Sequence, residues 1–204
     1  MDWMEEVREN LKKRRQILFS KDAVCLQPLA AQLAQQPHTV LVLWALAWAE
    51  ETVDTLEARY PQERRPLGPL APGLKKRGLL PLCPQERRPR EALEAARAWA
   101  AGALKMRPAQ RAILDCHALA KELTLKEDIA RCHGVGQACS VVHTPGHGLG
   151  YPLYDLTALV HQWGLEGCRE AVEARLRAYE TTLQTWSQRA ETYPGPWAAF
   201  LQKR

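Results

Sequence analysis

Apolar residues along this chain recur every three or four positions, which is the period of an α-helix. The clearest segment runs from near His38 toward Tyr60. Its first half, VLVLWALAWA, is apolar all round, and its second half, EETVDTLEARY, is amphipathic. A helix that is apolar on every side belongs in the core of a protein. The pattern therefore predicts a central buried helix whose second half reaches the surface.

The same spacing predicts helices on both sides of this segment. Thr124 and Glu127 form a Ser/Thr-x-x-Glu capping box, which predicts a helix start, and Pro152 predicts an interruption. Alanine and leucine dominate and β-branched runs are scarce, so we predict an all-α, single-domain bundle over residues 1–204 with about seven to nine helices. One N-terminal helix is expected to carry Trp3, Val7, Leu11 and Leu18, and others are expected at 23–36, 89–104, 108–123, 124–142 and 153–163.

The final predicted helix is long and amphipathic and covers residues 166–193. Its apolar residues alternate spacings of four and three, which is the heptad pattern of a coiled-coil seam. Such a seam packs either on the body of the same domain or on a second copy of the chain, which would form a homodimer. The sequence leaves both alternatives open. The seam consists of Val172, Leu176, Tyr179, Leu183, Trp186, Ala190 and Tyr193.

The helical pattern stops at residues 61–88. The hexapeptide PQERRP occurs at 61–66 and again at 84–89, around a stretch rich in proline and glycine. A repeat this short is no structural unit, so we interpret the segment as an exposed, inserted loop between two helices. It is also the densest positive region of the chain. Two interpretations stay open, a solvated insertion or an electrostatic contact for an acidic partner.

Charge and cysteine content narrow the class of protein. The 204 residues carry a formal net charge of +5, and acidic residues accompany the basic run at 12–15, so a nucleic-acid partner is not expected. The N-terminal sequence does not resemble a signal peptide, and six cysteines without a Cys-x-x-Cys pair suggest reduced thiols. The longest apolar run, at 40–49, is about half of the ~20 residues that a membrane span needs. We expect a cytoplasmic protein with no membrane segment and no cofactor.

The stretch HTPGHGLGY at 143–151 carries the most distinctive local chemistry. His-Thr-Pro-Gly-His resembles a zinc-binding turn of the metallo-β-lactamase superfamily. That fold also needs an upstream His-x-His-x-Asp-His cluster after a strand, and this sequence has neither. Thr144 and Pro145 instead fit the N-cap and first turn of a helix, and Gly146 and Gly150 allow a close helix approach. We therefore interpret the stretch as a bend between two helices.

Four histidines between residues 117 and 147 are candidate metal ligands, because imidazole suits zinc and other transition metals. They lie on several predicted helical segments, and their spacing does not show whether they meet. Two of them follow Cys116 and Cys132 directly. Adjacent residues on a helix point about 100° apart, so a cysteine and its neighbouring histidine are not expected to share one ion. The four candidates are His117, His133, His143 and His147.

A polar strip on the same helices is the candidate binding surface. His133, Gln137 and Ser140 share one helix face, which either forms a polar network inside the bundle or lines a groove. The sequence shows no nucleophile signature and no strand-borne phosphate loop, so no catalytic residue is assigned. The candidate binding residues are Asp115, His117, His133, Gln137, His143, His147 and Tyr154.

Several motifs occur in an order that is typical of one family. They are Trp44-Ala45 in a long helix, Arg-Pro-Arg at 88–90 before an alanine-rich helix ending in Ala-Arg-Ala-Trp at 96–99, His117 in the next helix, and Gly-Gln-Ala at 136–138 followed by His143 and His147. In this order they resemble the bacterial putative immunity protein family, small all-helical proteins of toxin–immunity systems. The resemblance covers roughly residues 38–160. Residues 61–83 look inserted relative to the family, and the helix after Glu166 lies outside the resemblance.

The resemblance implies a non-enzymatic protein that binds a cognate toxin and covers its active surface inside the producing cell. The leading hypothesis is therefore an immunity protein with a protein toxin as its partner. The alternative is a metal- or small-molecule-binding helical protein, including an enzyme, that uses the four histidines with Asp115 or Gln137 nearby. A third hypothesis is a nucleic-acid-associated protein that uses residues 12–15 and the basic loop.

Overall fold

The computed structural model describes residues 2–59, 87–193 and 195–202. In these ranges the regular backbone consists of α-helices and short 3-10 helices, and no strand occurs. The predicted all-α, multi-helix fold is therefore confirmed. No helix in the described ranges is long and apolar enough to cross a membrane.

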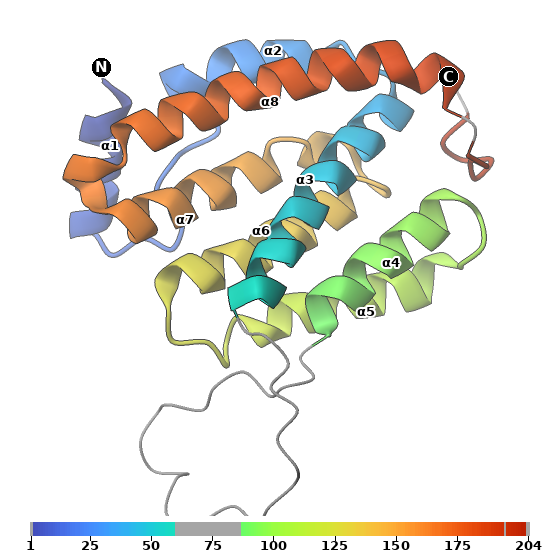
Figure 1. Cartoon of the computed structure of the whole chain (residues 1–204), viewed down its shortest axis with the longest axis horizontal. Coiled ribbons are helices and arrows are strands. Elements are labelled where there is room, and N and C mark those ends of the chain that lie inside the picture. Colours follow the sequence, from blue (N-terminus) through green and yellow to red (C-terminus); the bar gives the residue numbers. More distant parts are fainter. Residues whose placement is uncertain (1, 60–86, 194, 203–204) are drawn as a thin grey trace, which may run out of the picture.

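Eight α-helices make up the described part of the chain (Figure 1). This number lies within the predicted range. Before the gap at 60–86 the elements are α1 (Trp3–Lys12), η1 (Val24–Leu26), α2 (Gln27–Ala34) and α3 (His38–Arg59). After the gap they are α4 (Arg88–Ala100), α5 (Met106–Leu119), α6 (Lys126–Ser140), η3 (Pro145–His147), α7 (Gly150–Gly167), α8 (Arg169–Arg189) and η4 (Ala190–Thr192).

α1 is shorter than its apolar spacing predicted. Asp2 at the N-cap accepts a hydrogen bond from the backbone N–H of Met4 at 3.4 Å, and the helix ends shortly before Arg14, whose φ is +52°. Leu18 lies in the following loop, where the side-chain amide of Asn10 donates to its carbonyl oxygen at 2.9 Å. Leu18 is nevertheless fully buried. Its apolar position was therefore interpreted correctly, but its assignment to the helix was wrong.

α3 is the central helix, as its apolar surface predicted. It packs against α4, α6 and α8. Figure 1 shows it crossing between α8 on one side and the α4–α5 pair on the other. Trp44 is fully buried, and its indole N–H donates to the backbone carbonyl of Tyr179 in α8 at 3.2 Å. The apolar run of α3 therefore joins the two halves of the helical assembly.

The heptad seam of α8 packs inside the chain. Val172, Tyr179 and Leu183 are buried, and α8 contacts α2, α3 and α7. Of the two alternatives left open by the sequence, the structure shows packing on the body of the same chain. The buried residues of the seam are therefore covered within the chain, whereas Tyr193 is 42% exposed, and a homodimer through this helix stays a prediction.

A group of polar side chains is buried between α3, α7 and α8. The Tyr179 hydroxyl donates to the Asp155 carboxylate, and Nε of Arg175 lies 3.3 Å from the same carboxylate. The hydroxyls of Thr52 and Tyr151 share a hydrogen bond of 2.7 Å. Burial raises the pKa of Asp155, although the charge of Arg175 and the hydrogen bond from Tyr179 oppose this rise. We call these five residues the interior polar cluster.

Two predicted helix boundaries are wrong. Leu125, not Thr124, is the N-cap of α6, and no side chain caps this helix. The capping box does not form because Glu127 pairs with Arg59, at 2.9 Å, instead of turning back to the helix start. Pro152 does not interrupt a helix. It lies in the first turn of α7, where its missing N–H costs no intrahelical hydrogen bond.

The bend expected within HTPGHGLGY is present. α6 ends at Ser140, η3 follows with Thr144 at its N-cap, and α7 begins at Gly150. The inserted loop expected at 61–88 lies outside the described residues except at its end, where Arg88 is already the first residue of α4. The assignment of residues 1–204 to one domain stays a prediction.

Candidate functional site

Three of the four candidate histidines line one surface pocket of about 450 Å³. One wall is a face of α5, and the other comes from the end of α6 and the bend that follows it. Folding therefore brings together residues that the linear spacing left apart. We call this the histidine pocket. Its polar lining consists mainly of Gln110, His117, Gln137, Ser140, His143 and His147.

The fourth candidate, His133, pairs with His117 and is not a lining residue. Their Nδ1 atoms lie 2.9 Å apart, and their ring centroids lie 5.2 Å apart. The Tyr154 ring lies 5.2 Å from the ring of His133. A hydrogen bond between two Nδ1 atoms needs a proton on one of them and a lone pair on the other. When both rings are neutral, one Nε2 is consequently an acceptor and the other is a donor.

Burial favours the neutral form of both rings. Desolvation, with a smaller contribution from the neighbouring His133, lowers the pKa of His117 to about 4. Desolvation also lowers the pKa of His133. These shifts agree with the Nδ1–Nδ1 hydrogen bond, because two imidazolium rings would both be donors and could not form it. The pair is therefore an uncharged polar contact at neutral pH.

Close contacts at two glycines bring the walls of the pocket together. The His117 ring lies against Gly136, and the Gln137 side chain lies against Gly150, so that a β-carbon at either glycine would overlap its neighbour. The predicted close approach at Gly150 is confirmed. At Gly146, by contrast, an added β-carbon would meet nothing closer than 4.0 Å. Gly146 is therefore not needed for helix packing.

His143 and His147 lie on the bend and are exposed. Nδ1 of His143 lies 2.9 Å from the Thr144 hydroxyl oxygen. The His143 ring meets the ring of Trp99 edge to face, with centroids 5.8 Å apart. The ring of Phe200 also contacts Trp99, and the centroids of these two rings lie 5.9 Å apart. The mouth of the pocket therefore combines imidazole with aromatic carbon.

Asp115 does not line the pocket. Its carboxylate pairs with Arg111, one turn earlier on α5, at 3.3 Å. Cys116 and Cys132 are buried, whereas the histidine that follows each of them is half-buried, as their positions on a helix predicted. Within the described residues no three His, Cys, Asp or Glu side chains are grouped so that they could hold a metal ion. The geometry therefore gives no support to the metal-binding alternative.

Sequence reasoning missed five lining residues, Trp99, Gln110, Ile113, Leu114 and Thr144. A signal existed for three of them. Residues three, four and seven positions before His117 share its helix face, so the face could have been extended from that histidine. Trp99 comes from α4, and no local pattern connects it with the residues of α5 and α6.

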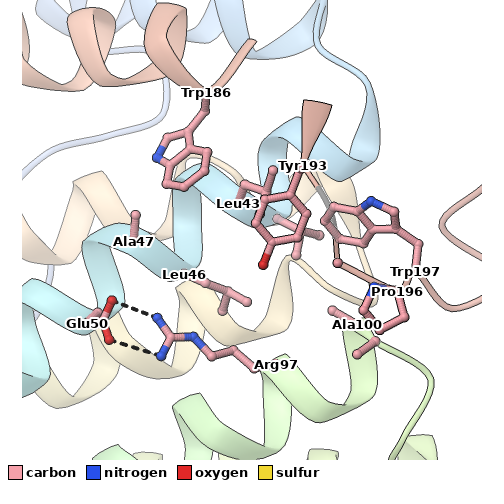
Figure 2. Close-up of a pocket in the computed structure, with 13 residues that line it drawn as sticks. Leu43, Leu46, Ala47, Glu50, Arg97, Ala100, Trp186, Tyr193, Pro196 and Trp197 are labelled. Atoms are coloured by element: carbon pink, nitrogen blue, oxygen red, sulfur yellow. Dashed lines mark hydrogen bonds and ion pairs between the residues drawn. The ribbon is translucent and has the colours of Figure 1, made fainter. Parts of the chain in front are cut away.

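A second pocket, of about 290 Å³, lies between α3, the end of α4, α8 and the segment that follows α8 (Figure 2). Leu43 and Leu46 of α3 contribute apolar surface to it, and a doubly hydrogen-bonded ion pair joins Glu50 to Arg97, with lengths of 3.0 and 2.7 Å. We call this the aromatic pocket. Its aromatic lining residues are Trp186, Tyr193 and Trp197.

The end of α4 separates the two pockets. Trp99 lines the histidine pocket, and the next residue, Ala100, lines the aromatic pocket. The backbone N–H of Ala198 donates to the carbonyl of Ala100 at 2.7 Å, and Phe200 contacts Trp99. One helix end and one C-terminal segment therefore contribute to the surroundings of both pockets.

The described residues thus form an all-α structure in which the histidine pocket and the aromatic pocket are separate. Comparison with known proteins identifies its family. The family model described as Imm-5 like putative immunity protein matches residues 79–182, half of the chain. The chain belongs to this family. Comparisons with curated proteins and with solved structures gave no match.

The matched range confirms the family resemblance and corrects its limits. The resemblance was assigned to roughly residues 38–160, whereas the match begins after α3 and includes most of α8. The helix after Glu166 therefore lies partly inside the family match, not outside it. All lining residues of the histidine pocket fall within the matched range, but Trp186, Tyr193 and Trp197 lie beyond its end.

Proposed function

We propose that this chain neutralises a protein toxin by binding it directly, without catalysing a reaction, and that the histidine pocket is the centre of the binding surface. Membership in the immunity protein family is the observation that carries the proposal. The family match spans every residue that lines this pocket. The pocket is therefore the surface feature best placed to serve a function common to that range of the chain.

The lining and rim of the histidine pocket have the composition of a protein interface. Among the residues that the structure describes, no Asp, Glu, Lys or Arg lines the pocket. Leu114, which lines it, is 62% exposed, and Phe200, which contacts Trp99, is 41% exposed. Met106 precedes Gln110 by one helical turn and is 44% exposed. The cores of protein interfaces are depleted of charge and enriched in aromatic residues and methionine, so this surface favours a protein partner.

The polar groups of the pocket are available for recognition. The side-chain amides of Gln110 and Gln137 form no hydrogen bond with another described residue. An amide can donate and accept, and so can a neutral imidazole. Buried polar groups at an interface need partners, because an unpaired one costs about 1–3 kcal/mol. A partner that supplies peptide N–H and C=O groups would meet this requirement.

Co-expression with the cognate toxin tests the proposal. We expect wild-type chain to restore growth of cells that produce the toxin and to copurify with it as a stoichiometric complex. Growth arrest in the presence of abundant folded chain, together with the absence of a complex, would exclude neutralisation by binding.

A pair of matched leucine variants tests the location of the surface. Leu114→Arg places a charge at the pocket and is expected to weaken toxin binding at least tenfold while the melting temperature stays close to wild type, because Leu114 is mostly exposed. Leu125→Arg is the control, since Leu125 is also exposed but lies at the opposite end of α6 from Gln137. Equal binding by both variants would show that the toxin contacts another surface.

A further inference from the structure

The aromatic pocket lies over apolar side chains of the central helix that keep only a small exposed fraction, 9% for Leu43 and 6% for Leu46. Leu43 and Leu46 line it from α3, although this helix is otherwise covered on most sides. Its volume of about 290 Å³ equals the space of roughly ten water molecules at ~30 Å³ each. That is at the lower end of the ~300–1,000 Å³ range of ligand pockets, so it suits one or two anchoring side chains.

Close packing after α8 positions the aromatic walls. The Tyr193 ring lies so close to Gly195 that a β-carbon on residue 195 would overlap the ring. The ring centroids of Tyr193 and Trp197 lie 5.5 Å apart. Figure 2 shows Trp186 and Tyr193 on two sides of the space that lies over Leu46. The walls therefore present ring faces and edges to an occupant from more than one direction.

The charges of the pocket favour a neutral occupant. Within the described ranges Glu50 and Arg97 are the two charged lining residues, and each terminal nitrogen of the guanidinium donates to one carboxylate oxygen. Their charges cancel, and an ionic ligand would have to break this bidentate pair in order to use either of them. The complementary ligand is consequently uncharged where it enters the pocket.

The unpaired polar groups favour an occupant with hydrogen-bond acceptors. The indole N–H groups of Trp186 and Trp197 and the hydroxyl of Tyr193 form no hydrogen bond with another described residue. Indole N–H groups only donate, and a phenol hydroxyl donates readily. Proline contributes a carbonyl acceptor, brings no N–H that would need a partner, and prefers the extended polyproline II conformation.

We propose that the aromatic pocket binds a proline-containing, extended segment of another protein. Stacking of proline rings on aromatic side chains, with indole and phenol groups donating to peptide carbonyls, is an established mode of peptide recognition in general. The neutral aromatic lining and the Tyr193 hydroxyl, which Figure 2 shows pointing toward Leu46, are complementary to such a segment. This proposal does not depend on the proposed toxin binding, because the two pockets share no lining residue.

The indole N–H signals of the intact chain provide a direct test. The chain has seven tryptophans, so its ¹⁵N-labelled form gives up to seven such signals. A ten-residue oligoproline peptide is expected to shift the Trp186 and Trp197 signals in a saturable way. A glycine–serine peptide of equal length is the control peptide. The Trp44 signal is the internal control, since its N–H is buried and bonded to the carbonyl of Tyr179.

Three variants identify the groups that bind. Trp186→Leu is expected to weaken oligoproline binding at least fivefold, and Tyr193→Phe, which removes only the hydroxyl, about two- to threefold. Trp163→Leu is the matched control, because Trp163 is exposed on α7 and does not line the pocket. We expect this variant to bind as wild type does. Melting temperatures of all three verify that they are folded.

Each of the following results would overturn the proposal. One is that the Trp186 and Trp197 signals stay unchanged at millimolar oligoproline, and another is that both peptides shift them equally. Signals that change with protein concentration in the absence of peptide would show that a second copy of the chain covers the pocket. Toxin neutralisation is measured separately, so none of these outcomes would bear on the function proposed for the histidine pocket.

Discussion

The interior polar cluster and the histidine pocket place similar polar groups at different depths. In the cluster, Asp155 and Tyr179 are buried and bonded to each other, and Arg175 pairs with the same carboxylate. In the histidine pocket, the amides of Gln110 and Gln137 have no partner among the described residues. Buried polar groups must be paired, whereas half-exposed ones can be hydrated. The cluster therefore serves stability, and the pocket keeps hydrogen-bonding capacity for a partner.

Truncation of Asp155 should produce the largest effect. Asp155→Ala leaves the buried Tyr179 hydroxyl without its acceptor, whereas Arg175 keeps its ion pair with Glu51 at 2.7 Å, so the expected cost is about 2–3 kcal/mol. This is a large part of the ~5–15 kcal/mol that keeps a typical domain folded. Urea unfolding measures the loss. Asp155→Asn is the control, since an amide oxygen can still accept from Tyr179, and it should lose less than half as much. A cost below ~1 kcal/mol for Asp155→Ala would contradict the structural role of the cluster.

A methyl group at Gly136 should perturb the histidine pocket by a smaller amount. In Gly136→Ala the added β-carbon overlaps the His117 ring, so the ring must move away from α6. Overpacking costs about 1–3 kcal/mol, and the better helix propensity of alanine offsets ~1 kcal/mol of it. We expect a net destabilisation of about 0–2 kcal/mol and a changed chemical shift of the His117 ring protons.

Gly167→Ala is the matched control for this change. A β-carbon at Gly167 would meet nothing within 4 Å, so this variant should be as stable as wild type or slightly more stable. If both glycine variants have the same stability and the His117 signals do not move, the close contact at Gly136 does not position the ring.

Acidification should produce the smallest of the three effects. The pKa of His117 is lowered from 6.5 to about 4 in the folded chain, and the pKa of His133 is lowered as well. Between these pH values the unfolded chain binds more protons than the folded chain. The contribution of the neutral His117 ring to the free energy of unfolding is therefore complete above pH ~6.5 and is lost as the pH falls toward 4. Because the ring is partly exposed, we expect a loss of about 1 kcal/mol.

Urea unfolding at pH 7.5 and pH 4.5 measures this loss. His117→Gln is expected to reduce the pH dependence, because glutamine does not titrate. His143→Gln is the control, since His143 is exposed on the bend, and it should keep the wild-type dependence. A wild-type pH dependence in His117→Gln would assign the effect to other groups.

Local patterns were sufficient for the helices but not for their ends. The apolar run at 40–49 identified the central helix, because the only stable place for such a surface is the interior. The capping box predicted at Thr124 does not form, because Glu127 pairs with Arg59, which lies 68 residues earlier in the chain. The prediction that Leu18 belongs to the first helix was wrong, because the side chain of Asn10 donates to the Leu18 carbonyl oxygen and stabilises a loop. Both incorrect helix boundaries result from side-chain contacts, one of them long-range, and the periodicity of apolar residues carries no information about such contacts.

The candidate site was likewise predictable in part from the sequence. The sequence indicated His117, Gln137, His143 and His147 as candidate binding residues, and the structure places all four around one pocket. It could not show that His133 pairs with His117, or that Asp115 faces Arg111 instead of the pocket. Side-chain chemistry is visible in the sequence, but the direction in which each helix face points depends on how the helices pack.

The sequence by itself determined the helical class, the buried position of α3 and the family resemblance, because periodicity, apolar content and motif order are properties of the chain. Only the tertiary structure decided that the seam of α8 packs inside the chain, that three histidines meet at one pocket, and that an aromatic pocket lies beside α4. The physical reason is that these features join α3, α4, α5, α6 and α8 across long stretches of chain. Contacts of this kind depend on helix packing and burial, which no local pattern records.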